Sequence, residues 1–303
     1  MPSECHAGRR SRASLILIVV LLLASCGSER TGLNGDVYNA LSLPEGRELV
    51  QLFDSDDDDV SLVEVGGHES TDLVSAVWVE AYGLSPNGLY LAVAFGEIKG
   101  NFLSMFRSDG GRFEMVSTSA IEDSIGGTIQ PTDDGGTVYA TVLADPARGD
   151  ASNLVSIDVD ESTSRRIPIP ESVGAPSYLG RLQLLDGNDT LLVGGSPSSS
   201  CALIEVELSN GRASCAIRSA GLFDPGVVLA DHLGRCKGLD LFATYTSLVP
   251  SSFAVIAVAV AEGAAPREIA LAEGLRPRFS CSTGQVSSAA PDFQSVSTIT
   301  LEL

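Results

Sequence analysis

The chain has 303 residues, enough for one large domain or two ordinary ones, and its apolar fraction of 44% is sufficient for a sizeable core. Wholesale disorder is therefore not expected. The sequence holds 39 acidic residues against 19 Lys and Arg, a formal net charge of −20. Such a charge opposes binding to nucleic acid, because phosphates require a basic face.

The N-terminus has the pattern of an export signal. Arg9, Arg10 and Arg12 precede an almost purely apolar run over residues 13–23. The run is too short to span a bilayer as a helix, which needs about 20 residues. A short apolar run behind arginines is typical of a signal peptide, so we expect residues 1–25 to be removed.

The apolar run ends in Leu23-Ala24-Ser25-Cys26, which resembles the lipobox of bacterial lipoproteins. The resemblance implies that the signal is cut before Cys26 and that this cysteine, now the first residue, carries acyl chains such as palmitate. Several acyl chains give stable anchoring, because each buried CH₂ contributes about 0.8 kcal/mol. The alternatives are an ordinary signal peptide with a chance cysteine, or an uncleaved N-terminal anchor.

Residues 26–33 are predicted to form a lipidated tether, because those that follow Cys26 are small and polar. Removal of the leader takes away three arginines and one glutamate and leaves a net charge of −22. Anionic lipid repels so acidic a body, so the lipid group has to hold it at the membrane. By the same resemblance, Gly27 permits transfer to an outer membrane where one exists; otherwise the protein stays on the outer face of the cell membrane.

Residues 34–303 are predicted to form an all-β domain. Short runs rich in β-branched and aromatic residues recur between turn clusters, with hardly any helical periodicity. The turns form two interleaved series, each with a step of roughly 50 residues. The first series is Asp109-Gly110, Glu161-Ser162, Asn210-Gly211 and Glu262-Gly263. The second is Asn87-Gly88, Gly135-Gly136, Asn188-Asp189, Lys237-Gly238 and Thr283-Gly284.

Two hairpins per unit make a four-stranded sheet, and repeated units of this size are typical of β-propeller blades. A lone blade cannot bury both of its apolar faces, whereas blades packed around an axis bury both. Complete units are predicted at 75–118, 121–170, 175–218 and 223–272, with about three strands in each of 34–66 and 275–303. This predicts six blades, or five if the two ends share one, with the first and last blades paired to close the ring.

One segment carries a sharper resemblance. Ser85-Pro86-Asn87-Gly88-Leu89-Tyr90-Leu91-Ala92 resembles the S-P-D-G-x-x-L-A segment of TolB-type and WD-repeat-like β-propellers, and residues 131–139 are a looser copy with one residue inserted. The resemblance implies a propeller body. It assigns no subfamily, because the sequence has no Trp-Asp signature.

Six cysteines are present, of which Cys5 leaves with the leader and Cys26 is the predicted lipid site. The remaining four are Cys201, Cys215, Cys236 and Cys281. An even number in an exported chain indicates two disulfides, with three possible connectivities. Metal binding by these cysteines is less favoured, because no CxxC spacing occurs.

Cys236 and Cys281 precede equivalent turns of adjacent units, so a bridge between neighbouring blades is plausible. Cys201 would then pair with Cys215. A regular hairpin turning at Asn210-Gly211 places these two about five residues out of register, too far for a bridge whose Cα atoms lie within about 7 Å. Either this hairpin is irregular or one pair stays reduced.

The acidic run over residues 54–59 is interpreted as a solvated hairpin turn. Asp54, Asp56 and Asp58 match alternate ligand positions of a calcium loop, but Asp59 and Val65 stand where an EF-hand needs glycine and glutamate. A weak, non-EF calcium site is the alternative, and no other metal site is predicted.

No catalytic residue set and no cofactor motif is found: there is no G-x-S-x-G, phosphate-cradling glycine loop or H-E-x-x-H. His68, between two blades, and Asp231-His232 are interpreted as polar loop residues, because triad members must converge in space. Any site is expected on the loops at one mouth of the propeller. These are residues 68–71, 96–101, 144–152, 195–200 and 246–252.

Two functions from different classes remain open, beside a third possibility, a surface protein with no dedicated ligand. The first is a membrane-anchored scaffold that binds a protein, peptide or other ligand of the cell envelope at the propeller mouth, favoured by an apolar and aromatic mouth. The second is a hydrolase- or lyase-type propeller enzyme or a sugar-binding protein, favoured by Asp, Glu and His converging on the axis. The fold alone does not choose between them.

Overall fold

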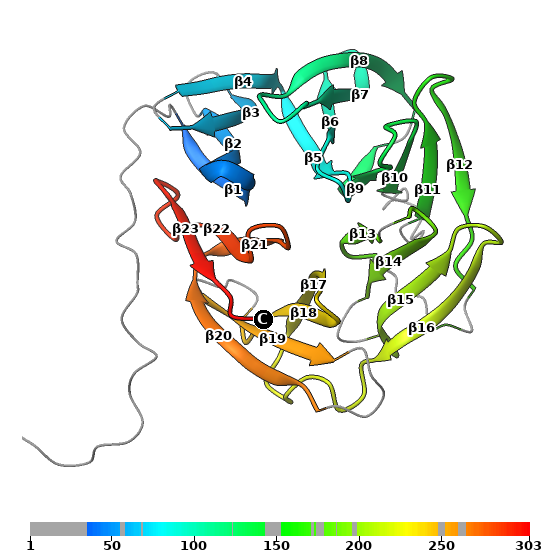
Figure 1. Cartoon of the computed structure of the whole chain (residues 1–303), viewed down its shortest axis with the longest axis vertical. Coiled ribbons are helices and arrows are strands. Elements are labelled where there is room, and N and C mark those ends of the chain that lie inside the picture. Colours follow the sequence, from blue (N-terminus) through cyan, green and yellow to red (C-terminus); the bar gives the residue numbers. More distant parts are fainter. Residues whose placement is uncertain are drawn as a thin grey trace, which may run out of the picture.

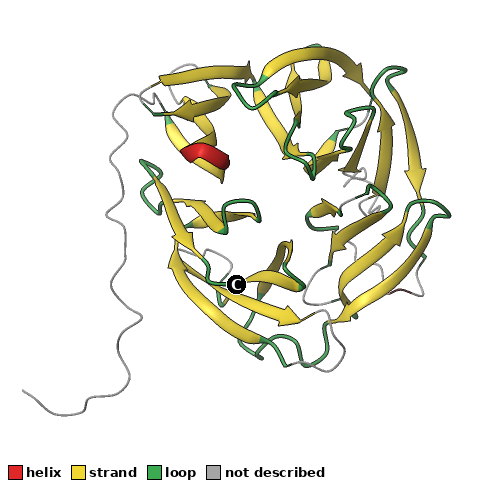
Figure 2. Cartoon of the chain, in the orientation of Figure 1, coloured by secondary structure: helices red, strands yellow, loops and turns green. Residues whose placement is uncertain are grey.

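The computed structural model of the chain is a ring of six β-sheets around a central axis, a β-propeller (Figure 1). It describes residues 35–303 apart from 55–57, 68, 123, 143–152, 171–172, 174–178, 186, 196–198, 248–251 and 260–264. The predicted leader and tether lie outside the described residues. Strands dominate the rest, and a 3-10 turn, η1 (Pro44–Gly46), follows the first strand (Figure 2).

Each of the first three blades is a four-stranded antiparallel meander whose first strand lies innermost (Figure 1). Blade 1 consists of β1 (Asp36–Ser42), β2 (Arg47–Asp54), β3 (Asp59–Gly66) and β4 (Glu69–Ala76). Blade 2 consists of β5 (Trp78–Leu84), β6 (Tyr90–Glu97), β7 (Gly100–Arg107) and β8 (Glu114–Ile121). Blade 3 consists of β9 (Ile125–Pro131), β10 (Thr137–Val142), β11 (Asn153–Asp158) and β12 (Thr163–Ile167).

The other three blades repeat the pattern, and the sixth has three strands in the described part. Blade 4 consists of β13 (Leu182–Leu184), β14 (Thr190–Gly194), β15 (Cys201–Glu207) and β16 (Arg212–Arg218). Blade 5 consists of β17 (Leu229–Cys236), β18 (Leu239–Tyr245), β19 (Ser252–Ala259) and β20 (Arg267–Glu273). Blade 6 consists of β21 (Leu275–Ser280), β22 (Gln285–Ala289) and β23 (Val296–Thr300).

The prediction of six blades is confirmed, and the alternative of five with a shared blade is wrong. Blade 1 has four strands of its own, because Glu69–Ala76 forms β4 rather than part of a connection between blades. The start of β4 is polar and exposed, which is why its sequence indicates a loop. His68 itself lies outside the described residues.

Each inner strand carries apolar residues on both faces. In β6, Leu91 and Val93 pack toward blade 1, whereas Ala92 and Ala94 pack toward blade 3. The alternation follows from the two-residue period of a strand. Across the ring it produces six buried clusters, one between each pair of neighbouring blades.

The ring closes by packing of blade 6 against blade 1 without a shared sheet. Val37, Val50 and Val63 of blade 1 form the closing cluster with Ala289 of blade 6. Polar contacts reinforce it: the Val37 amide donates to the Phe293 carbonyl at 2.6 Å, and the hydroxyls of Ser42 and Ser287 lie 2.6 Å apart. The predicted pairing of the first and last blades is thus a face-to-face contact.

The propeller-like segment at residues 85–92 makes a turn that side chains stabilise. Asn87 Oδ1 accepts from the Leu89 amide at 2.9 Å, and the Asn87 amide donates to Asp133 of the next blade at 2.7 Å. In blade 3 the corresponding glycine, Gly135, has a φ of +74°, and a Cβ there would lie 2.6 Å from the Tyr90 ring. The turn residues therefore also connect neighbouring blades.

Both candidate disulfides are formed. Cys236 is bonded to Cys281, with 5.6 Å between the Cα atoms, and this bond joins blades 5 and 6. Cys201 is bonded to Cys215 within blade 4, with a Cα separation of 5.7 Å. The expected separation was too large because the turn spans residues 208–211, which places Cys215 opposite Ile204 rather than Val206. The hairpin is also irregular, with two register shifts between Cys201 and Ile204.

The packing of the blade faces predicts the cost of a core truncation. Phe242, 1% exposed, fills the cluster between blades 4 and 5 and meets Phe223 edge-on with ring centroids 5.7 Å apart. Phe242→Ala should lower the free energy of unfolding by about 3–5 kcal/mol, measured by urea denaturation. Leu271→Ala on the outermost strand, where Leu271 is 74% exposed, should change it by less than about 0.5 kcal/mol. Equal effects would contradict the packing described.

Candidate functional site

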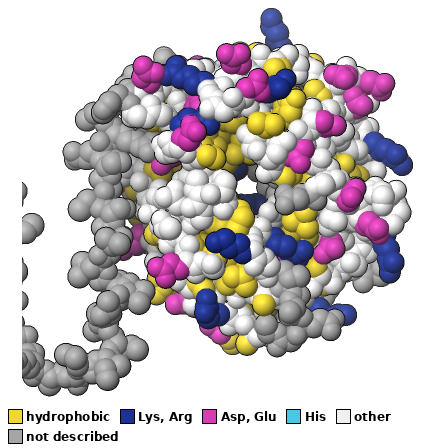
Figure 3. All heavy atoms as spheres, viewed as in Figure 1, with side chains coloured by type: hydrophobic (Ala, Val, Ile, Leu, Met, Phe, Trp, Pro, Cys, Tyr) yellow, Lys and Arg dark blue, Asp and Glu magenta, His cyan; other side chains and the backbone are white. Residues whose placement is uncertain are grey.

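A cavity of about 850 Å³ opens at the centre of the ring, at the end where the innermost strands turn into the second strands. Figure 3 shows a hollow at the centre of this face, with Lys and Arg side chains beside it. The described polar and charged residues that line it are Glu45, Arg47, Tyr82, Ser85, Asn87, Ser108, Thr128, Gln130, Arg181, Gln183, Arg235, Lys237, Arg278, Ser280 and Ser282. Leucines from the same strands and turns supply most of the apolar wall.

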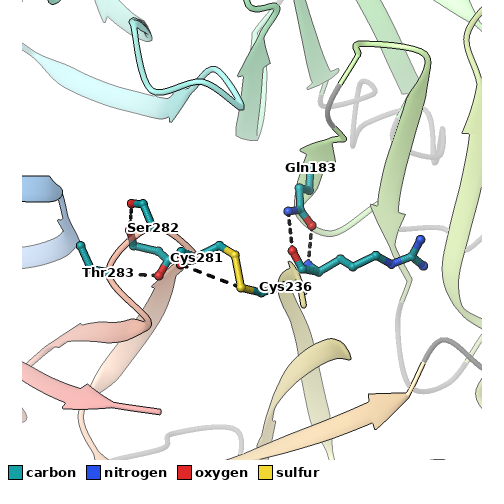
Figure 4. Close-up of a disulfide and its surroundings, with 7 residues drawn as sticks. Gln183, Cys236, Cys281, Ser282 and Thr283 are labelled. Carbon is teal, nitrogen blue, oxygen red and sulfur yellow. Dashed lines mark hydrogen bonds between the residues drawn. A yellow bond between two sulfur atoms is a disulfide. The ribbon is translucent and has the colours of Figure 1, made fainter. Parts of the chain in front are cut away.

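Side-chain amides from two blades fix the cavity wall. Gln183 of blade 4 accepts from the Arg235 amide at 2.5 Å and donates to the Arg235 carbonyl at 3.0 Å, which joins β13 to β17 (Figure 4). Gln130 of blade 3 donates to the Leu84 carbonyl of blade 2. Each contact occupies backbone groups that no sheet pairing uses, so the wall is held in place from blade to blade.

Arg278 plays the corresponding role in blade 6 with a charged group. Its Nε donates to Asn39 Oδ1 of blade 1 at 3.1 Å, and its Nη1 donates to the Tyr82 carbonyl of blade 2 at 3.0 Å. The guanidinium lies 4.0 Å from the centre of the Tyr82 ring. Burial lowers the pKa of Arg278 below its usual value, because the charged form loses water.

A buried ion cluster lies behind the wall in blade 5. Arg235 donates to both carboxylate oxygens of Asp240 at 3.0–3.2 Å, and His232 Nε2 lies 3.1 Å from the same carboxylate. Burial raises the pKa of Asp240, but the His232 and Arg235 hydrogen bonds outweigh it and lower the pKa overall. Arg235 and Asp240 neutralise each other. Because the Arg235 backbone also binds Gln183, the cluster holds this part of the cavity wall in position.

His232 was interpreted as a polar loop residue, and that interpretation is wrong. It lies on β17, is 1% exposed, and packs against the Phe242 ring at a centroid distance of 5.1 Å. Burial lowers the pKa of His232, because the imidazolium would lose water inside blade 5. Its place is structural, since it is absent from the cavity lining.

The Cys236–Cys281 disulfide forms part of the cavity rim. Both cysteines line the cavity, and the Gln183 side chain from blade 4 binds the backbone of Arg235, the residue directly before Cys236 (Figure 4). The bond ties the end of β17 to the turn after β21. The rim between blades 5 and 6 is therefore covalently closed.

A second, smaller hollow of about 440 Å³ lies where β1 and β5 begin. Aromatic residues from blades 1, 2 and 6 line it, among them Tyr38, Phe53, Trp78 and Phe293. The two hollows differ in chemistry, because this one has no basic residue in its described lining.

The sequence-predicted candidates do not converge on either hollow. Asp54 and Asp59 pair at the β2–β3 turn, Asp58 lies in that turn with a φ of +56°, and Asp56 lies outside the described residues. In the described part of the chain no three metal-ligating side chains gather. The calcium site stays a prediction. None of the described residues of the five candidate loops lines the central cavity.

The cavity residues were missed although the sequence carried a signal for them. Each turn of the second series follows an innermost strand, so the residues two to seven positions ahead of these turns reach the cavity. These positions hold Tyr82, Gln130, Arg181, Gln183, Arg235 and Arg278. The candidate loops fall between the second and third strands of blades 2 to 5 and between the third and fourth strands of blade 1, whereas the cavity residues lie near the turns between first and second strands.

No protein-family model and no curated protein matches the chain. The structure is similar to the PQQ-bound aldose sugar dehydrogenase of Streptomyces coelicolor, with a TM-score of 0.54, 15% identity, and coverage of 89% of this chain and 95% of that one. It is similar to the hydrazine synthase of Kuenenia stuttgartiensis, with a TM-score of 0.54, 13% identity, and coverage of 89% of this chain and 78% of that one. It is also similar to a chain of a nidogen–laminin complex, with a TM-score of 0.51, 10% identity, and coverage of 88% of this chain and 83% of that one. At these identities the likeness shows the propeller fold alone.

The buried His232 predicts a pH dependence of stability. Its pKa in the folded state lies below the ordinary value of about 6.5, so the unfolded chain binds a proton that the folded chain does not. The free energy of unfolding should therefore fall as the pH drops below about 6.5, by up to about 1.4 kcal/mol per pH unit. In urea denaturation at pH 7, 6 and 5, His232→Gln should weaken this fall. His68→Gln, the control, should retain it; an unchanged slope in His232→Gln would contradict the assignment.

Proposed function

We propose that the protein is an exported lipoprotein, held at a bacterial membrane by acyl chains on Cys26, whose propeller binds a ligand or partner at the central cavity. The cavity of about 850 Å³ is the observation that carries the binding role, because it lies within the size range of ligand sites and its wall is fixed from blade to blade. The membrane is the outer membrane where the organism has one, and otherwise the outer face of the cell membrane.

Two features support export. The lipobox-like Leu23-Ala24-Ser25-Cys26 follows a short apolar run. The two disulfides form and persist in oxidising compartments rather than in the cytosol. Within the described residues, no helix is long and apolar enough to cross a membrane.

The lining favours binding over acid–base chemistry. Among the described lining residues Glu45 is the one carboxylate, and no histidine is present. The alternative, a propeller enzyme or sugar-binding protein that uses acids and histidines at the mouth, therefore finds little support in this wall. The similar structures include enzymes and a complex between two proteins, so the fold does not decide the matter.

The proposed lipid anchor predicts that replacing Cys26 releases the protein from the membrane. Cys26→Ala, expressed from the full chain, should lose its acyl groups and leave the membrane fraction, because the acidic body has no other attraction to anionic lipid. Fractionation and the mass of the mature N-terminus are the measurements. Cys5→Ala, a cysteine of the predicted leader, is the matched control and should stay membrane-bound. Cys26→Ala remaining at the membrane in full amount would refute lipid anchoring.

If ligands bind in the central cavity, a bulky side chain at its rim should prevent their binding. A ligand found by thermal-shift screening of envelope extracts, peptides and saccharides should raise the melting temperature of the mature chain, since binding to the folded state stabilises it. Ser282→Trp at the cavity rim should abolish the shift by obstruction. Ser214→Trp, exposed on the outermost strand of blade 4, should leave it intact. A ligand shift that survives Ser282→Trp would place binding elsewhere.

A further inference from the structure

The cavity has the opposite charge to the rest of the protein. The chain carries a net charge of −20, yet the described lining of the cavity holds five basic side chains and one acidic one. Acidic residues are twice as numerous as basic ones in the sequence, so this wall departs from the composition around it.

Two of the five basic side chains are already neutralised by ion pairs within the fold. Arg47 pairs with Glu64 at 2.5 Å, and the Glu64 side chain is 2% exposed. Arg235 binds Asp240 with two nitrogens and lies 3.8 Å from Glu205. The charges of these two guanidiniums are balanced by carboxylates, so they are not counted as binding groups for an anion.

The other three are not neutralised in the described structure. Arg278 has neutral partners, Asn39 Oδ1 and the Tyr82 carbonyl, and forms no ion pair with a described residue. The Arg181 carbonyl accepts from the Gly194 amide at 2.8 Å, but its half-buried side chain, just ahead of β13, makes no hydrogen bond or ion pair with a described residue. The same holds for the exposed side chain of Lys237 at the rim. The wall therefore leaves three cations available to one cavity.

The positive charge of Arg181 reaches other blades. Burial is the main cause of the pKa shifts of Tyr82 in blade 2, His232 in blade 5 and Arg278 in blade 6, and the charge of Arg181 additionally lowers each of these pKa values. Arg181 and Arg278, which line the same cavity from blades 4 and 6, thus repel each other. Like charges that face one cavity are unfavourable unless an anion lies between them.

Contact between blades does not by itself require a charged side chain. Gln130 and Gln183 make the equivalent contacts to neighbouring blades with neutral amides. A neutral side chain thus performs this role elsewhere in the same ring, whereas blade 6 retains a guanidinium. The Tyr82 hydroxyl adds a further donor: Tyr82 lines the cavity, and its buried oxygen has no hydrogen-bond partner among the described residues.

We propose that Arg181 and Arg278, with Lys237 at the rim, form an anion-binding site at the centre of the propeller for a small ligand that carries two or more carboxylate, phosphate or sulfate groups. The inference rests on the proposed function and names its ligand class. Guanidiniums recognise planar and tetrahedral oxyanions through paired N–H donors. The leucines of the wall contact the apolar body of the ligand. Long polyanions are excluded, because they would extend over the acidic surface outside the cavity.

Titration calorimetry on the mature chain tests the site, with citrate and pyrophosphate as probes at constant ionic strength and glucose as the neutral control. Citrate, pyrophosphate or both should bind, and glucose should not. Arg181→Gln should weaken binding by about 10-fold or more, and Arg181→Glu should abolish it. Binding of citrate alone assigns the site to carboxylates, and binding of pyrophosphate alone assigns it to phosphates.

Arg212→Gln, on the exposed outermost strand of blade 4, removes the same charge away from the cavity and should leave the affinity unchanged. Arg181→Gln should melt close to the wild type, since the Arg181 side chain makes no hydrogen bond or ion pair with a described residue and the backbone hydrogen bond to Gly194 is kept. Absence of binding by both anions, or an equal loss in Arg181→Gln and Arg212→Gln, would overturn the site. If another ligand still binds and is displaced by Ser282→Trp, the scaffold function stands and the anion site alone fails.

Discussion

The structure depends on a single constraint: every blade is apolar on both faces. A four-stranded meander of this kind cannot bury both faces alone, so each blade needs a neighbour on either side. The six interblade clusters satisfy this requirement in turn, and the sixth, between Val37, Val50, Val63 and Ala289, closes the circle. Closure requires no strand from the other end of the chain, because face-to-face contact already buries the apolar area.

Ring packing also explains why the cavity can carry charge. Neighbouring innermost strands pack against one another around the axis, and a cavity remains at one end of it that the residues just ahead of each first turn line. Interblade polar contacts from Gln130, Gln183 and Arg278 hold these residues in place. The apolar clusters between the blades supply the stability, so the cavity can hold Arg181, whose side chain makes no hydrogen bond or ion pair with a described residue.

The repeat lattice could be predicted from the sequence because it is local. Turn residues such as Asn87-Gly88 and Gly135-Gly136 recur at a fixed step, and alternation such as Leu91 to Ala94 shows both faces apolar. Glu69–Ala76 was missed because an outer strand needs few apolar residues. The register shifts that bring Cys201 to Cys215, and the convergence of Arg181 and Arg278 from different blades, depend on three-dimensional arrangement, which spacing along one chain does not reveal.

Native-state hydrogen exchange across the innermost and second strands tests ring closure by packing most directly. If blade 6 is held by the cluster it shares with blade 1, amides of β22 should exchange through the same global opening as those of β14 and β18, with equal free energies. Exchange of β21–β23 through a separate opening of clearly lower free energy would contradict the account, because the ring would then be open between its ends.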